Sequence, residues 1–166
     1  MSERRIGYLG LGSNVGDSAG HLRAAIELLE GEGIEIDAVS SAYVTEPVGE
    51  ILDQPDFLNA AVRIRTDLEP EELLDACKRV EAERGRQFDL PRHSPRPLDV
   101  DLLLLGDVEM SNDRLTLPHR EATSRRFVLV PLLELDPGLT LPDGTRLADS
   151  LANLPEGERV ERARLL

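Results

Sequence analysis

Two aspartates lie two residues apart in an otherwise apolar run at residues 98–105. Side chains alternate along a strand, so Asp99 and Asp101 would share one face. The opposite face would then hold Leu98, Val100, Leu102 and Leu104. Unpaired buried carboxylates are costly, and oxygen ligands at this spacing suit Mg²⁺ bound together with substrate phosphates. The run therefore predicts a metal–phosphate site.

An edge strand whose solvent face carries two acids would show the same pattern. The preceding residues favour the site, because four arginines fall within thirteen positions there, namely Arg84, Arg86, Arg92 and Arg96. Glycine and three prolines interrupt this stretch, which predicts a loop. Guanidinium groups bind phosphate oxygens, so the loop would supply anion clamps beside the metal, as phosphoryl transfer requires.

A second group of residues could hold a planar heterocycle. Phe57 and Asn59 would share one face of a predicted strand, where an aromatic ring can stack and an amide can form paired hydrogen bonds. Alternatively, Asn59 bonds only neighbouring backbone. His119, which precedes Arg125 and Phe127, could bond a phosphate or could be structural.

The glycines near the N-terminus suggest a nucleotide motif only weakly. The run Gly10–Asn14 follows a predicted strand, but the next glycine of a dinucleotide fingerprint is replaced by Val15. No Gly-Lys-Ser/Thr sequence occurs, which excludes a P-loop. We therefore interpret these residues as a turn that needs glycine.

Length and charge narrow the function classes. The 166 residues predict one domain, 1–166, and the net charge of −13 disfavours nucleic acid and anionic membranes as partners. Cys77 lies at helical spacing among apolar residues and reads as a core residue. With no signal peptide or transmembrane run, we expect a cytoplasmic protein. Lys78 is the only lysine.

The spacing of apolar residues predicts the order strand, helix, strand, strand, helix, strand. This is the ferredoxin-like βαββαβ arrangement of an α+β fold. We expect a mainly antiparallel sheet with helices on both sides. The expected elements are strands Arg5–Leu11, Ile34–Val44, Phe57–Thr66 and residues 98–105, and helices from Asp17 or Ser18 to Gly31 and between Pro70 and Gly85. Extra C-terminal elements would be a hairpin near 109–117, helices near 127–135 and 148–154, and a tail, 156–166, that frays.

Together these residues closely resemble the 6-hydroxymethyl-7,8-dihydropterin pyrophosphokinase family of folate biosynthesis, whose members move a diphosphate from ATP to a pterin alcohol and release AMP. The resemblance covers nearly the whole chain. Its anchors, in order, are Leu9–Asn14, Asp53–Val62, Pro95–Asp101 and Leu117–His119.

The resemblance implies a role for each matching position. Asp99 and Asp101 would bind two Mg²⁺ ions that bridge the ATP phosphates. The pterin pocket would consist of Thr45, Val48, Phe57, Asn59 and Phe127, with the two phenylalanines sandwiching the ring. Arg86 and Arg96 would engage the phosphates during catalysis. The remaining positions that match the family's ATP site are Glu81, Leu102, Leu115, Thr116, His119 and Arg125. We also expect Lys78 and Arg92 to bind ATP. The segments Glu46–Asp56 and Arg86–Arg96 would be mobile loops.

Three positions depart from the family pattern. His93 stands where many relatives have tryptophan, Phe88 replaces a loop arginine, and Arg120 replaces a tyrosine. We expect a monomer whose partners are the small molecules ATP and hydroxymethyldihydropterin. Two other functions remain open at this point: a nucleotide-binding regulatory module without turnover, and a kinase that transfers only the γ-phosphate.

Overall fold

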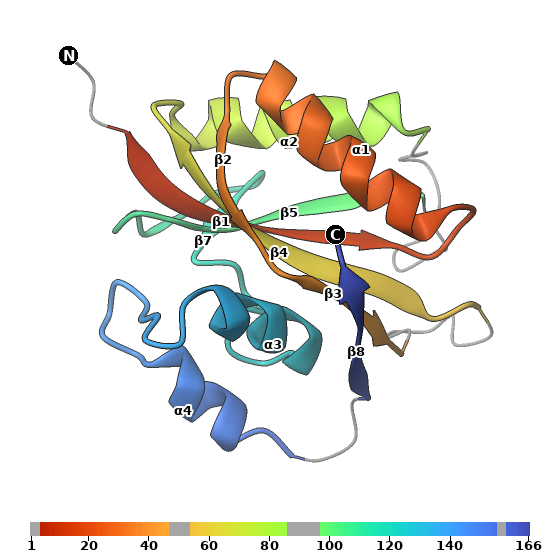
Figure 1. Ribbon diagram of the computed structural model, residues 1–166. Coiled ribbons are helices and arrows are strands. Elements are labelled where there is room, and N and C mark those ends of the chain that lie inside the picture. Colours follow the sequence, from red (N-terminus) through yellow and green to blue (C-terminus); the bar gives the residue numbers. More distant parts are fainter. Residues whose placement is uncertain (1–3, 47–53, 86–96, 156–158) are drawn as a thin grey trace.

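An antiparallel sheet forms the middle layer of the molecule, with α1 and α2 on one face and α3 on the other (Figure 1). The computed structural model describes residues 4–46, 54–85, 97–155 and 159–166. The helices are α1 (Ser18–Gly31), α2 (Pro70–Glu83), α3 (Arg126–Leu135) and α4 (Leu147–Ala152). The strands are β1 (Arg5–Ser13), β2 (Glu35–Val39), β3 (Ser41–Thr45), β4 (Phe57–Thr66), β5 (Asp99–Leu105), β6 (Met110–Ser111), β7 (Thr116–Leu117) and β8 (Val160–Leu165).

The main sheet has the order β5-β1-β4-β3-β8, and β2 also pairs with β4. This order and the helices on both faces confirm the predicted ferredoxin-like core with added C-terminal elements. The strands β6 and β7 form the short hairpin expected near residues 109–117. Within the described ranges, no helix has both the length and the apolar character needed to cross a membrane.

Local hydrogen bonds explain where the two long helices begin and end. The Asp17 carboxylate accepts a bond of 3.1 Å from the Gly20 amide and caps α1. At the start of α2 the Glu69 amide donates to the Glu72 carboxylate at 3.0 Å, which is half of a capping box. Beyond the end of α2, Gly85 has a φ of +85°, a left-handed conformation that favours glycine.

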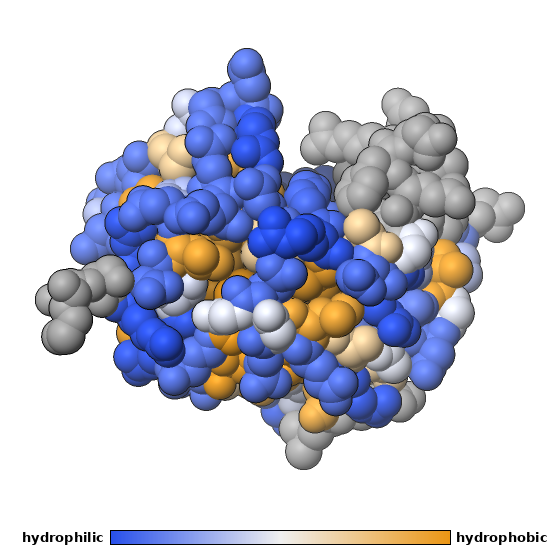
Figure 2. All heavy atoms as spheres, turned by 90° about the horizontal axis from the view of Figure 1, so that it is seen from above, coloured by the Kyte–Doolittle hydropathy of each residue, from blue (hydrophilic) through white to orange (hydrophobic). Residues whose placement is uncertain are grey.

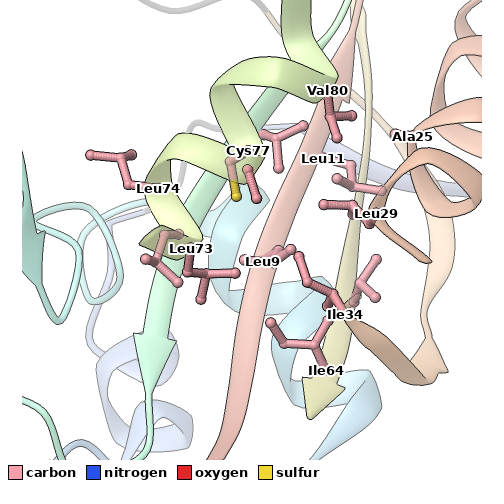
Figure 3. Close-up of a cluster of buried hydrophobic side chains, with 14 of the residues drawn as sticks. Leu9, Leu11, Ala25, Leu29, Ile34, Ile64, Leu73, Leu74, Cys77 and Val80 are labelled. Carbon is pink, nitrogen blue, oxygen red and sulfur yellow. The ribbon is translucent and has the colours of Figure 1, made fainter. Parts of the chain in front are cut away.

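One face of the sheet packs against α1 and α2 to form the larger core. Figure 3 shows Leu9, Leu11 and Ile64 of the sheet among apolar side chains of both helices. Cys77 of α2 is fully buried there, and burial raises the pKa of its thiol to about 12. Its interpretation as a core residue is therefore confirmed. The outer face of these helices is mostly hydrophilic, with hydrophobic residues gathered near its middle (Figure 2).

The opposite face packs against α3 and α4 around a smaller apolar cluster. Its buried members are Tyr8, Ala61, Leu103, Leu104, Val128, Leu129, Leu132 and Leu147. The prediction that Leu104 shares a face with Leu102 was wrong. Leu102 pairs with Leu9 and Leu104 with Tyr8, so Leu103 is an extra residue in β5. This bulge reverses the alternation beyond it and turns Leu104 toward α3.

The predicted strand Ile34–Val44 is two strands, because Ser40 interrupts it. The Ser40 hydroxyl accepts a bond of 2.8 Å from the Ala61 amide and donates one of 2.8 Å to the Ser41 carbonyl. A side chain therefore takes part in the bonding that a continuous backbone ladder would otherwise provide.

Two segments form more strand structure than the sequence predicted. β1 continues through Gly12 to Ser13, so Gly12 belongs to a strand and not to a turn. The tail 156–166, expected to fray, contains β8, which pairs with β3. The tail lacks an obvious apolar face, but strand pairing uses backbone groups and does not need one.

Candidate active site

Three neighbouring strands bring the predicted site residues side by side. Gly12 of β1 pairs with Asn59 of β4 on one side and with Asp99 of β5 on the other. Gly10 pairs with Asp101 in the same way. Directly paired residues point to the same side of a sheet, so the two aspartates and the amide share a face. It is the face covered by α3, because Leu11, between the glycines, points into the core under α1 and α2.

The two glycines leave space between these polar groups. A Cβ atom at Gly12 would lie only 2.6 Å from Asn59 Oδ1, which no real Cβ tolerates. A Cβ at Gly10 would meet Leu103 Cδ1 at 3.4 Å, an ordinary contact. Gly12 therefore allows the Asn59 amide to lie over β1 toward the aspartates.

A buried threonine orients the Asn59 amide. Asn59 Nδ2 donates to Thr45 Oγ1 at 2.6 Å, and Thr45 is only 2% exposed. The Oδ1 acceptor is thereby directed over Gly12. The ring of Phe57 lies beside the same place, 3.8 Å from a Cβ built at Gly12. Phe127, the second residue of α3, is half-buried against the cluster on this side of the sheet.

His119 borders β5 close to the aspartates. Its amide donates to the Leu103 carbonyl at 2.9 Å, and its Nδ1 accepts from the Glu121 amide at 3.1 Å. Burial lowers the pKa of His119, against the opposing effect of the Glu121 and Asp99 carboxylates. The imidazole is therefore neutral near pH 7. With Nδ1 accepting, its proton is on Nε2, which can donate to a phosphate oxygen.

Glu81 supports the aspartate strand from the other side. Its carboxylate is fully buried, and Oε2 accepts a bond of 2.8 Å from the amide of Val100, the residue between the aspartates. Lys78 Nζ lies 3.3 Å from Glu81 Oε1. Among the described strands β5 is the edge of the sheet, so this carboxylate accepts from an amide on the open side of that strand. Leu102, also predicted for the ATP site, has its side chain in the core under α1 and α2.

The other predicted ATP-site residues lie on the segment between β5 and α3. Leu115 is buried against the larger core, and Thr116 in β7 lies with its hydroxyl 3.2 Å from that of Ser111. Arg125, just before α3, forms an ion pair with Glu121 at 3.8 Å. Four predicted site residues fall outside the described part of the chain, as do most residues of the two predicted loops: Val48, Arg86, Arg92 and Arg96.

The pair of aspartates fits a metal held jointly with a ligand. Among the described residues no three His, Cys, Asp or Glu side chains are grouped to hold an ion by themselves. Two half-buried carboxylates on one strand face supply hard oxygen ligands and leave coordination positions for phosphate oxygens and water. This donor set suits Mg²⁺ bound with a nucleotide.

Sequence reasoning missed two features of this region. It placed Gly12 in a turn. Gly10 and Gly12 are two residues apart, and this spacing matches the alternation of side chains along a strand. It also gave no role to Asn14, which is 4% exposed. Asn14 Nδ2 donates to Gln54 Oε1 at 2.7 Å and to the Pro55 carbonyl at 3.1 Å, and so joins the end of β1 to the residues before β4.

This arrangement occurs in a chain whose residues 8–137 match the model of the 7,8-dihydro-6-hydroxymethylpterin-pyrophosphokinase (HPPK) family. The chain belongs to this family. It is 47% identical over 157 residues to the 2-amino-4-hydroxy-6-hydroxymethyldihydropteridine pyrophosphokinase of Methylorubrum extorquens, covering 93% of this chain and 98% of that one. The Pseudomonas aeruginosa enzyme of the same name is 42% identical, covering 93% of this chain and 94% of the relative.

Some relatives are larger proteins. The folate synthesis bifunctional protein of Arabidopsis thaliana is 44% identical over 127 residues, which are 76% of this chain and 26% of that protein. Among solved structures, the HPPK-DHPS of Plasmodium falciparum superposes with a TM-score of 0.69 at 14% identity, covering 91% of this chain and 45% of that chain. At that identity the similarity establishes the fold alone, which is the HPPK fold.

Proposed function

We propose that this protein transfers a diphosphate group from ATP to 6-hydroxymethyl-7,8-dihydropterin and releases AMP, a step of folate biosynthesis. The observation that carries the proposal is the row Asn59–Gly12–Asp99 across three strands. It puts an amide suited to a heterocycle next to a carboxylate suited to a metal–phosphate complex. Family membership and the names of the relatives support the same reaction.

The pterin would lie on the α3 face of the sheet. Asn59 Oδ1, held in place by the Thr45 bond, would accept from the N–H groups of the pyrimidine edge. Phe57 and Phe127 would stack on the two faces of the ring. Val48 would line the same pocket.

ATP would bind on the β5 side, with the reacting phosphates near Asp99 and Asp101. These carboxylates would hold two Mg²⁺ ions together with the phosphates, and the bound ions would neutralise triphosphate charge. His119 would donate from Nε2 to a phosphate oxygen. Arg86 and Arg96 would take up charge that develops on the transferred group, and Arg92 and Arg125 would add positive charge nearby. Lys78 and Thr116 would complete the ATP site, and the buried side chains of Glu81, Leu102 and Leu115 would support it from the core under α1 and α2.

The reaction needs no protein nucleophile. The hydroxymethyl oxygen of the pterin attacks the β-phosphorus in line, forming a new O–P bond. The bond from the β-phosphorus to the bridging oxygen of the α-phosphate breaks, AMP leaves with that oxygen, and the alcohol proton is released. The side chains act by fixing the attacking oxygen and the phosphorus in this geometry and by excluding water.

Identification of the nucleotide product tests the proposal. The protein is incubated with MgATP, with and without the reduced hydroxymethylpterin, and the nucleotides are separated. We expect AMP and a pterin diphosphate in a one-to-one ratio, formed only when the pterin is present. ADP would identify a γ-phosphate kinase, no product would identify a binding module, and AMP without pterin would identify a hydrolase.

A further inference from the structure

The C-terminal strand β8 lies against the strand that carries Thr45, although it falls outside the residues that match the family model. Val160 pairs with Thr45, and Thr45 in turn pairs with Phe57 of β4. Figure 1 shows β8 beside β3 at the edge of the sheet. The start of β8 is therefore next to the strand ends that form the proposed pterin pocket.

Arg159, just before β8, contacts both of these strand ends. Its amide donates to Glu46 Oε1 at 2.7 Å, and its guanidinium forms an ion pair with Asp56. Glu46 directly follows Thr45, and Asp56 directly precedes Phe57. One residue thus bridges the end of β3 and the start of β4.

The strand register explains why a cation is needed at this place. Continuing the Thr45–Phe57 pairing by one residue sets Glu46 opposite Asp56. Two like charges opposite each other on neighbouring strands repel and destabilise the pairing. The Arg159 guanidinium pairs with Asp56 and the Arg159 amide bonds Glu46, so this residue offsets the repulsion where the pocket residues begin.

The middle of β8 is held separately. Arg162 Nε donates to Ser41 Oγ at 3.0 Å, and its guanidinium lies 3.6 Å from the Glu134 carboxylate of α3. Glu134 also accepts from the Ser41 amide at 2.9 Å and from the Tyr43 hydroxyl. These contacts keep β8 on the sheet when Arg159 is changed, so the role of Arg159 can be tested alone.

We propose that Arg159 is a positioning residue for the pterin substrate. It holds the ends of β3 and β4 together, so that Thr45 can orient the Asn59 amide and Phe57 keeps its place beside it. The inference rests on the proposed function, because it assumes that a pterin occupies this pocket. It assigns pterin affinity, and not ATP affinity, to a residue of the C-terminal segment.

The test compares Arg159→Ala with the wild-type protein by fluorescence titration of the pterin and by steady-state kinetics. We expect the pterin dissociation constant and the pterin KM to rise about two- to fivefold, the range of an exposed ion pair. The KM for ATP and the kcat at saturating pterin stay unchanged. Arg79→Ala, which removes an exposed arginine paired with Glu32 at 2.6 Å on the α1–α2 side, is the matched control and changes none of these values.

A rescue experiment separates positioning from general stabilisation. In the Arg159→Ala background, Glu46→Gln with Asp56→Asn removes the repelling charges, and we expect most of the pterin affinity to return. An Arg159→Ala protein with wild-type pterin affinity would overturn the inference. So would an equal rise in the KM for ATP, or a failure of the charge-neutral triple variant to recover. Failure of the wild-type protein itself to bind pterin would instead overturn the proposed function.

Discussion

The two faces of the central strands differ in what their side chains do. Toward α1 and α2, β1 presents Leu9 and Leu11, both at most 1% exposed, within one continuous apolar core. Toward α3, the alternate positions of the same strand are Gly10 and Gly12, which leave space beside half-buried acids and an amide. One face gains stability from burial, and the other leaves room for ligands on a backbone that the first face keeps rigid.

Removing one carboxylate should have the largest effect on the α3 face. Asp101→Asn, or Asp99→Asn, should lower turnover by about a thousandfold or more, the size seen when a preorganised electrostatic contact is lost. The melting temperature should stay the same or rise, because one of two neighbouring like charges is removed. Turnover at saturating Mg²⁺ and thermal unfolding measure the two effects. Near-normal turnover in either variant would contradict the metal-ligand assignment.

Shortening a leucine should have the converse effect on the α1–α2 face. Leu9→Ala should lower the free energy of unfolding by about 2–5 kcal/mol, because it leaves a cavity in a fully packed core. The kcat of the folded fraction should change little. Denaturant unfolding and active-site titration check both values. A loss of kcat as large as that of Asp101→Asn would show that the two faces are not separable.

Glu81 connects the two faces and should show a mixed effect. Glu81→Ala leaves the Val100 amide without its carboxylate partner and should cost about 1–3 kcal/mol of unfolding free energy. Turnover should fall as well, since Val100 lies between the two aspartates. Glu81→Gln keeps an oxygen acceptor and should retain more of both. If the two variants behave alike in unfolding and in kinetics, the hydrogen bond to Val100 is unimportant.

The glycines should differ from each other in their effect on ligand binding. Gly12→Ala forces the Asn59 amide to move and should weaken pterin binding by up to about tenfold, the value of one hydrogen bond. Gly10→Ala, whose Cβ meets only ordinary contacts, is the matched control and should have a smaller effect. Fluorescence titration of the pterin measures both. Equal effects would mean that the space over Gly12 is not what orients the amide.

The smallest effect should appear in the pH dependence of stability. Burial lowers the pKa of His119 in the folded protein below its ordinary value of about 6.5. As the pH falls below about 6.5, the unfolded chain takes up a proton that the folded protein does not, so stability is lost. His119→Gln should therefore lose less unfolding free energy between pH 7 and pH 5 than the wild-type protein. An identical loss in both proteins would argue against a buried neutral imidazole.

The sequence was sufficient where a local period or a local hydrogen bond decides the structure. Strand Phe57–Thr66 was predicted with its bounds, because its alternation is uninterrupted. The starts of α1 and α2 follow from caps formed by residues three positions apart. The facing of Asp99 and Asp101 was also correct, because both lie before the bulge. The motif residues were enough to predict the family that the comparisons established.

The tertiary structure alone decided features that depend on residues distant in the chain. The bulge at Leu103 is a property of the pairing between β1 and β5, so the sequence of β5 could not predict it. Glu81 was predicted to lie in the ATP site, and only the packing of α2 against β5 shows its bond to Val100. The pairing of β8 with β3 uses backbone groups that every sequence has, so no pattern in the tail could predict it.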